Sequence, residues 1–359
     1  MESRPTPAPP DMSATQPAAS NAAASTDGAA TEGATAALQG IVANVEQVIT
    51  GKRRVVELAV VALAAGGHVL LEDVPGVGKT MLARSLARSI DGVFARVQGA
   101  PDLLPADVTG ASIYVQHEQR FEFIPGPVFA NIVLVDELNR TTPRTQAALL
   151  EALEERQVTV DGVSHDLPEP HVVIATQNPL DHAGTFPLPE SQLDRFTVAT
   201  SLGYPTPGQE REIVRARLSR RPIDELRPVI TTTRVAALQA QVREVSVADE
   251  VIDYAVRLVD TTRGHDAVEL GASPRAAIQL IHAAQAMALL RGRAWVLPDD
   301  VKELAVAVLG HRLVVRRGAT LLGRAERGAG GAGGLPVDAG QRRGDLVIDE
   351  LLRTVSLPS

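Results

Sequence analysis

A glycine-rich turn between an apolar strand and a helix constrains this chain more than any other feature. Residues 70–80 read Leu-Leu-Glu-Asp-Val-Pro-Gly-Val-Gly-Lys-Thr, and a helix-forming segment continues from Met81. Glycines without a Cβ let the backbone turn its N–H groups toward phosphate oxygens, and the helix N-terminus adds partial positive charge. In such a loop Lys79 reaches the β- and γ-phosphates, and the Thr80 hydroxyl binds Mg²⁺. The segment therefore predicts a phosphate-binding P-loop.

Two further observations bear on this interpretation. Asp73 stands where the strict motif has its first glycine, and a chance Gly-Lys-Thr at a helix start is the alternative reading. The chain has only three lysines, Lys52, Lys79 and Lys302, so arginine supplies almost all other positive charge. A lysine at this position of the turn favours the P-loop interpretation.

Composition limits the class of protein. The chain has 359 residues, 45% of them hydrophobic, which is enough for one large and one smaller domain. It has no cysteine, so disulfides and thiolate metal sites are excluded, and its formal net charge of −8 gives no overall attraction to nucleic acid or anionic membranes. No apolar run reaches the length of a membrane span and no secretory signal pattern is present, so we expect a soluble cytoplasmic protein.

Composition and periodicity divide the chain into five stretches. We expect an Ala-, Pro-, Ser- and Thr-rich disordered tail (1–36), an α/β core with a parallel sheet (37–204), an all-helical domain (205–317), a Gly-rich flexible insertion (318–340) and a C-terminal helical segment (341–359). The core strands are continuous apolar runs near residues 69–71, 94–97, 132–135, 172–176 and 197–199, as in a sheet covered on both faces. Alternating segments predict two hairpins, 112–116 with 120–124 and 158–160 with 163–167.

Polar side chains follow two of these strands. Asp136 and Glu137 end the third, where we expect Asp136 to hold Mg²⁺ and Glu137 to polarise the attacking water. Asn178 follows the fourth and could bind the lytic water or the γ-phosphate. The alternatives are a helix cap for the two acids and a plain Asn-Pro turn for Asn178.

Two arginines complete the candidate set. Arg195 ends a short predicted helix and suits a γ-phosphate contact supplied by a neighbouring subunit, or an ion pair with Asp194 or another acid. Arg275 follows Ser273, a plausible N-cap, and Pro274 at the first helical position. A cation in a first helical turn opposes the helix dipole, which favours an anionic partner; an ordinary surface arginine is the alternative.

Together these segments resemble the MoxR-type AAA+ ATPases over about residues 37–316. The resemblance rests on residues 70–80 and 129–140, on Gln146–Gly162, on Thr176–Pro179, on Leu188–Phe196 and on Gly271–Ala276. Asp73 fits it too, since Glu-Asp-Val-Pro is usual in that family.

The resemblance implies a role for each matched residue. It makes Lys79 and Thr80 the Walker A residues, Asp136 and Glu137 Walker B, Asn178 sensor 1, Arg195 the arginine finger and Arg275 sensor 2. It places ATP against residues matched by Ile49, Gly51, Gly76, Val77, Gly78, Lys79, Thr80 and Met81, with Mg²⁺ on Thr80 and Asp136. It makes the hairpins the helix-2 insert and the pre-sensor-1 hairpin, which face a central pore, and it leaves open whether Arg275 acts on its own subunit's nucleotide.

The resemblance further implies Mg²⁺-dependent ATP hydrolysis by a ring, expected to be a hexamer. That hydrolysis would drive chaperone-like remodelling or maturation of a protein substrate, with a partner carrying a von Willebrand A domain. The alternatives are a motor subunit of a metal chelatase, a nucleic-acid motor, and a non-hydrolysing nucleotide-gated scaffold. The hairpins offer few basic residues, which disfavours nucleic acid, and the presence of both Asp136 and Glu137 disfavours the scaffold.

Overall fold

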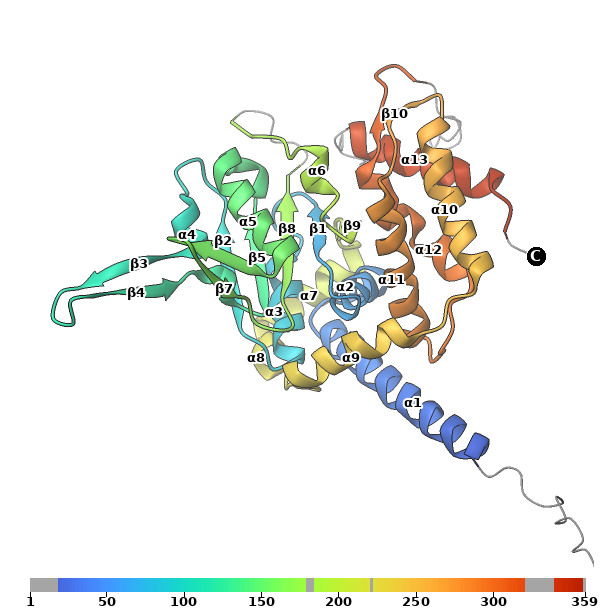
Figure 1. Cartoon of the computed structure of the whole chain (residues 1–359), viewed down its shortest axis with the longest axis horizontal. Helices are drawn as coiled ribbons and strands as arrows, with labels where there is room; N and C mark the ends of the chain where they lie inside the picture. Colours follow the sequence, from blue (N-terminus) through green and yellow to red (C-terminus); the bar gives the residue numbers. More distant parts are fainter. Residues whose placement is uncertain (1–18, 179–183, 220–221, 320–338, 358–359) are drawn as a thin grey trace, which may run out of the picture.

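A parallel β-sheet with helices on both faces and a helical domain beside it make up the structure (Figure 1). The structure, a computed structural model, describes residues 19–178, 184–219, 222–319 and 339–357. Part of the predicted Gly-rich insertion and the first 18 residues of the predicted tail lie outside these ranges.

The central sheet has five strands in the order β2-β5-β8-β1-β9, and every neighbouring pair is parallel. The strands are β2 (Phe94–Gln98), β5 (Ile132–Asp136), β8 (Val172–Gln177), β1 (Val69–Glu72) and β9 (Val198–Thr200). β1, β5 and β8 are buried along their apolar residues, as expected for strands covered on both faces. The predicted parallel α/β core is confirmed.

Strand alternation divides the interior into two clusters, one on each face of the sheet. Leu71, Leu134 and Ile174 belong to the cluster that also contains buried residues of α1 (Ala19–Glu46), α2 (Arg53–Ala64) and α3 (Lys79–Ser89). Leu70, Val135 and Ala175 belong to the other, with residues of α5 (Pro143–Glu155). Consecutive residues of one strand thus anchor opposite layers.

The N-terminal helix corrects one sequence-based expectation. α1 begins at Ala19, so the stretch from Ala19 to residue 36 is helical and does not belong to a disordered tail. Alanine has the highest helix propensity, and Ala34 is fully buried. The Thr35 hydroxyl donates to the Leu289 carbonyl at 2.8 Å, which ties the end of the predicted tail to the helical domain.

Both predicted hairpins are present. β3 (Gly110–Val115) pairs with β4 (Arg120–Pro125) and projects from the core, whereas β6 (Gln157–Val160) and β7 (Val163–Asp166) form a shorter one (Figure 1). Phe123 of the first stacks on His165 of the second, with ring centroids 3.9 Å apart. The two hairpins are therefore in contact.

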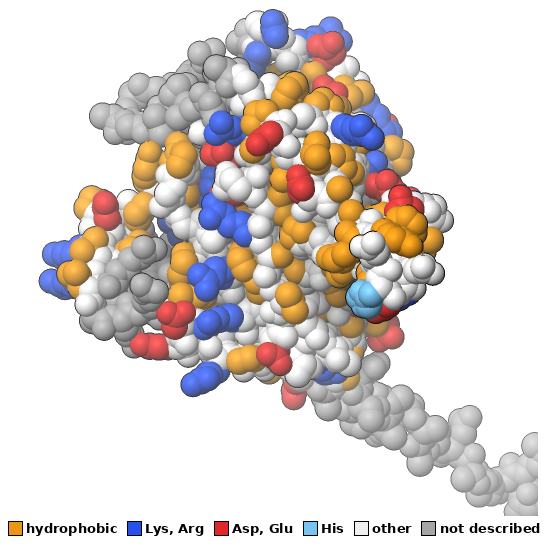
Figure 2. All heavy atoms as spheres, turned by 90° about the vertical axis from the view of Figure 1, so that its left-hand side faces the viewer, with side chains coloured by type: hydrophobic (Ala, Val, Ile, Leu, Met, Phe, Trp, Pro, Cys, Tyr) orange, Lys and Arg blue, Asp and Glu red, His pale blue; other side chains and the backbone are white. Residues whose placement is uncertain are grey.

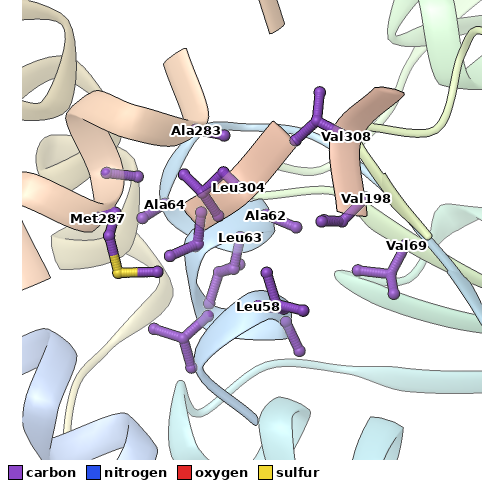
Figure 3. Close-up of a cluster of buried hydrophobic side chains, with 14 of the residues drawn as sticks. Leu58, Ala62, Leu63, Ala64, Val69, Val198, Ala283, Met287, Leu304 and Val308 are labelled. Carbon is purple, nitrogen blue, oxygen red and sulfur yellow. The ribbon is translucent and has the colours of Figure 1, made fainter. Parts of the chain in front are cut away.

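The second domain is helical, as predicted, with one short antiparallel pair in addition. Its elements are α7 (Pro207–Ser219), α8 (Pro222–Glu225), α9 (Thr232–Glu244), α10 (Asp249–Gly264), β10 (Val268–Leu270), α11 (Pro274–Leu290), α12 (Pro298–Leu309), β11 (Val314–Val315) and α13 (Ala339–Thr354). Figure 3 shows residues of α2, β1 and β9 meeting α11 and α12 in one buried cluster. The helical domain thus packs directly on one edge of the sheet. Among the described residues, no helix is long and apolar enough to cross a membrane.

Candidate functional site

The glycine-rich turn leads from β1 into α3, in the arrangement that the sequence predicts. Gly78 is the N-cap of α3 and has φ 106°, a conformation that L side chains rarely adopt. Lys79 follows as the first helical residue, and its side chain lies largely buried with Nζ donating to the Asp73 carbonyl at 2.9 Å. Desolvation by burial lowers the pKa of Lys79, opposed by the negative charges of Asp136, Asp73 and Glu137. The turn therefore holds the desolvated Lys79 amine close to three carboxylates. Such a site suits an anion that binds together with a cation.

Asp136 ends β5 beside this lysine. Its Oδ1 accepts a hydrogen bond from the Thr176 hydroxyl of β8 at 2.7 Å, and its Oδ2 lies 2.7 Å from Arg96 Nη2 of β2. Side chains from the two strands that flank β5 thus fix one carboxylate. Parallel strands put their carboxyl ends at the same edge, so this contact follows from the sheet order.

Glu137 lies just past the strand in a left-handed conformation, with φ 56°. Its N–H donates to Thr176 Oγ1 at 2.9 Å, and its carboxylate accepts from Gln98 at 3.2 Å and from Arg140 at 3.1 Å. A Cβ on Gly99 would lie 2.1 Å from the Glu137 carbonyl oxygen, so only glycine fits there. The left-handed backbone therefore directs Glu137 away from the line of β5, and the Gln98 and Arg140 side chains hold its carboxylate.

The remaining candidates at this edge occupy flanking positions. Asn178 follows β8 at its carboxyl end and is half-buried. Ile49 is buried in the main core cluster, and the Gly51 carbonyl accepts from Gln209 of α7 at 3.4 Å. The segment from 49 to 51 thus borders the start of the helical domain. The edge brings together Lys79, Asp136 and Glu137, with Asn178 at the end of the neighbouring strand.

The two candidate arginines lie elsewhere, and they meet on one carboxylate. Arg195 Nη2 lies 3.0 Å from Glu154 Oε2, and Arg275 Nη1 lies 2.6 Å from Glu154 Oε1. Arg195 also donates to the Leu150 carbonyl. The ion pair anticipated for Arg195 is thus present, with Glu154 in place of Asp194. Ser273 caps α11 and Pro274 occupies its first turn, as predicted, and the anion facing Arg275 is Glu154 of the same chain.

This arginine cluster lies at the amino-terminal edge of the sheet. Thr197 N, two residues after Arg195, donates to the His68 carbonyl at 2.9 Å, just before β1 begins. His68 Nε2 lies 3.0 Å from the carbonyl of Leu153, the neighbour of Glu154. The P-loop follows the other end of β1, and four residues at about 3.3 Å each place the two edges about 13 Å apart before the loops are counted.

A buried polar junction supports the arginine cluster. Arg312, 5% exposed, donates to the Phe196 carbonyl at 2.6 Å and lies 3.6 Å from Asp194, whose carboxylate also accepts from Ser273 at 2.9 Å. Burial lowers the pKa of Arg312 to about 10, opposed by Asp194. Burial and the positive charge of Arg312 lower the pKa of His311 to about 3, so this imidazole is neutral. The junction fixes residues 194–196 against the helical domain.

Sequence reasoning missed the residues that position the predicted ones. Thr176, Arg96, Gln98, Arg140 and Glu154 each contact a candidate site residue. Arg96 and Gln98 become neighbours of the acids only through the β2–β5 pairing. Arg140, Glu154 and Thr176 lie within the segments that carry the family resemblance, and that position is the signal by which they could have been found.

Comparisons with known proteins agree with this geometry. Residues 68–198 match the model of the ATPase family associated with various cellular activities (AAA), and residues 260–326 match the AAA lid domain. The chain is 39% identical to Chaperone MoxR1 of Mycobacterium tuberculosis, covering 89% of this chain and 82% of that protein. It is 50% identical to the uncharacterized protein YeaC of Bacillus subtilis, covering 76% and 86%.

A solved structure is similar over almost the whole chain. It is the crystal structure of a candidate ATPase from Cytophaga hutchinsonii, with a TM-score of 0.80 and 33% sequence identity. The match covers 94% of this chain and 99% of the other. Both the sheet domain and the helical domain therefore have counterparts in one known structure.

Proposed function

This chain belongs to the MoxR-type AAA+ ATPases, and from that premise we propose that it works as a ring in which neighbouring subunits complete each ATP site. Hydrolysis would be Mg²⁺-dependent and would drive chaperone-like remodelling or maturation of protein complexes. The observation that carries this proposal is the separation of the arginine cluster from the P-loop of the same subunit.

The separation supports shared sites in the following way. An arginine finger contacts the γ-phosphate directly. Arg195 and Arg275 are held together at the amino-terminal edge of the sheet, whereas Lys79 lies at the carboxyl-terminal edge. A second copy docked head-to-tail would bring the arginines of one subunit to the P-loop of the next. Repeating that heterologous contact, where the rotation closes, would give a ring, which we propose to be a hexamer. In such a ring Arg275 would act on a neighbour's nucleotide.

The carboxyl-edge residues fit ATP with Mg²⁺. The Thr80 hydroxyl and the Asp136 carboxylate are hard oxygen donors, which Mg²⁺ prefers. Among the described residues there is no cluster of three or more His, Cys, Asp or Glu side chains that could hold a metal alone. Mg²⁺ at nucleotide sites keeps its waters and takes phosphate oxygens, so one carboxylate and one hydroxyl suffice. We assign Glu137 to polarising the attacking water, Asn178 to orienting it, and Ile49, Gly51, Gly76, Val77, Gly78 and Met81 to the nucleotide.

The projecting hairpin favours a protein substrate over nucleic acid. Its exposed side chains include Tyr114 and Phe121, which are 53% and 71% exposed and pack on each other. Its one arginine, Arg120, is paired with Glu118 and Glu122. Figure 2 shows hydrophobic side chains interspersed with both signs of charge on the face from which the hairpin projects. A hairpin of this kind suits polypeptide contact, because its one arginine is already paired with acids and binding to phosphates depends on positive side chains.

Two finer elements of the proposal rest on the family alone. A partner with a von Willebrand A domain and a cytoplasmic location are both expected of such an ATPase. One relative is named a chaperone, which agrees with action on proteins. Co-purification of a partner with the full chain would test the first of these expectations.

The experiment that tests shared sites mixes two inactive variants. Lys79→Ala removes the phosphate contact, and Arg195→Ala removes the arginine, so each alone should lose ATP hydrolysis. In mixed rings a Lys79→Ala subunit still offers Arg195 to a neighbour with an intact P-loop. Random mixing in equal amounts should restore about a quarter of the wild-type sites.

Controls make the result specific. Mixing Lys79→Ala with Arg257→Ala, which removes an exposed arginine of α10, should only dilute normal sites. Wild-type specific activity should also rise with protein concentration. Activity that is independent of concentration and untouched by Arg195→Ala would mean a self-contained site and would end the ring proposal.

A further inference from the structure

Asp73 occupies the position at which the strict phosphate-loop motif has glycine, and its side chain is almost fully buried at 3% exposed. Buried carboxylates require hydrogen-bond partners. Among the described residues, the Asp73 carboxylate accepts its hydrogen bonds from one short segment, residues 201–203, which follows β9 and leads toward the helical domain.

The contacts satisfy both carboxylate oxygens. Oδ1 accepts from the Ser201 hydroxyl at 2.7 Å and from Gly203 N at 2.8 Å, and Oδ2 accepts from Leu202 N at 2.6 Å. Hydrogen bonds to an ionised acceptor are stronger than neutral ones, and two of these donors are backbone groups. The carboxylate therefore fixes the path of the main chain between the sheet and α7.

The backbone of the same residue faces the phosphate site. The Asp73 carbonyl accepts from Lys79 Nζ at 2.9 Å, and its N–H donates to the Gln177 carbonyl at the end of β8 at 3.2 Å. A phosphate that bound Lys79 would compete with that carbonyl for the ammonium. One residue is thus linked to the phosphate-binding lysine through its backbone and to the 201–203 segment through its side chain.

The segment beyond Gly203 also contacts residues at and next to Gly51, which we assign to nucleotide binding. Lys52 Nζ donates to the Tyr204 carbonyl at 3.0 Å, and Gln209 of α7 donates to the Gly51 carbonyl at 3.4 Å. The entry to the helical domain is therefore held at one end by Asp73 and at the other by residues 51–52. Both ends border the proposed nucleotide site.

We propose that Asp73 is a positioning residue that couples the phosphate-binding loop to the segment leading into the helical domain. The inference rests on the proposed role of Lys79 in phosphate binding. If Asp73 were replaced by the glycine of the strict motif, the loop should still bind nucleotide. Nucleotide binding should then no longer affect the segment that leads into the helical domain.

The test compares Asp73→Gly with wild type in three measurements on the full chain: ATPγS affinity, kcat at saturating protein and ATP, and hydrogen exchange of residues 201–206. We expect ATPγS affinity to stay within about threefold, and kcat to fall about tenfold or more because charge-assisted hydrogen bonds are lost. In wild type ATPγS should change the exchange of Leu202 and Gly203, whereas in the variant exchange should be fast with and without nucleotide.

Two further variants guard against trivial outcomes. Asp73→Asn keeps the shape, but its amide nitrogen faces a donor, so we expect kcat between those of wild type and Asp73→Gly. Ser201→Ala removes one hydrogen bond without altering the loop, and should lower kcat a few-fold with unchanged ATPγS affinity. The Ser201→Ala result decides the matter if Asp73→Gly fails to fold, which a thermal melt would show.

The outcomes are separable from those of the ring proposal. Wild-type kcat in Asp73→Gly, or exchange that still responds to ATPγS, would overturn the coupling. Parallel loss of affinity and kcat would also overturn it, by showing a local role in the loop. The exchange measurement needs nucleotide binding only, so it stands even if the mixing experiment finds no shared sites.

Discussion

The two edges of the sheet carry the two halves of the candidate chemistry, and they are built differently. At the carboxyl-terminal edge, Lys79, Asp136 and Glu137 converge because three parallel strands end side by side. At the amino-terminal edge, Arg195 and Arg275 come from different domains and both pair with Glu154. The first edge is complete within one chain, whereas the second presents two guanidinium groups that share a single carboxylate.

This difference indicates which charged group each edge would bind. The acids of the carboxyl edge lie close to its lysine, and we propose that together they bind nucleotide and Mg²⁺. The arginine pair retains net positive charge after its pairing with Glu154, with Arg195 and Arg275 26% and 36% exposed. On the ring proposal, phosphates bound at the carboxyl edge of one subunit and the exposed arginines of the next would supply opposite charges for head-to-tail assembly.

A large effect on turnover without loss of binding is expected of Glu137→Gln at the carboxyl edge. The amide keeps the shape of the side chain and removes the base that would polarise water, so kcat should fall about 10²- to 10⁴-fold. ATP affinity should stay close to wild type, because Lys79 and the loop are unchanged. Steady-state hydrolysis and ATPγS binding would measure the two quantities.

A matched variant controls for the hydrogen bonds around this carboxylate. Gln98→Ala removes one donor to Glu137 and leaves the carboxylate itself in place. It should lower kcat far less than Glu137→Gln does. Hydrolysis by Glu137→Gln at the wild-type rate would show that another group polarises the water.

The contrast between the edges also explains what the sequence could predict. The P-loop, Asp136, Glu137 and the five strands follow from local patterns, since strand periodicity and turn chemistry are properties of short segments. Parallel pairing then brings these strand ends together without further information. For this reason the sequence predicted that Lys79, Asp136 and Glu137 lie at one edge of the sheet, but it did not predict the residues that support them.

The amino edge depends on contacts between distant segments. Glu154 reaches Arg275, 121 residues away, and Thr35 reaches Leu289, 254 residues away. No periodicity or motif encodes such pairings. The same reason accounts for the end of the predicted tail, where Ala34 is buried and Thr35 contacts the helical domain only in the folded chain.

Mild acid should weaken the amino edge through its buried histidines. Desolvation lowers the pKa of His68 to about 3, from its ordinary 6.5, and that of His311 to about 3 as well. Between these values the unfolded chain binds protons that the folded chain does not, so the free energy of unfolding falls as pH falls below 6.5. From about pH 7.5 to about pH 5.5 each histidine should remove about 1.4 kcal/mol.

Urea unfolding at the two pH values would measure this loss, and one variant would isolate His68. His68→Gln keeps a donor for the Leu153 carbonyl and cannot be protonated, so its loss across that range should be smaller by about 1.4 kcal/mol. An unchanged loss would mean that His68 does not contribute to the pH dependence.

The smallest expected effect tests whether Glu154 positions the two arginines for a neighbouring subunit or competes with that subunit's phosphate for them. In Glu154→Gln one amide replaces a carboxylate that accepts from both guanidinium groups, so at most one arginine keeps its acceptor. The three side chains are about a third exposed, and solvent screening keeps such pairs weak. We therefore expect a fall in kcat of about threefold, equivalent to about 0.6 kcal/mol, with ATPγS affinity unchanged.

Glu155→Gln is the matched control, since it changes the next residue of the same helix end and should leave kcat at the wild-type value. A rise in kcat in Glu154→Gln alone would reverse the interpretation of the amino edge. It would mean that Glu154 competes with the neighbour's phosphate for the arginines and that assembly must break the pair. A fall in kcat confined to Glu154→Gln would mean that the carboxylate holds both arginines in position for the neighbouring subunit. Glu154 would then support assembly of the shared site and would not inhibit it.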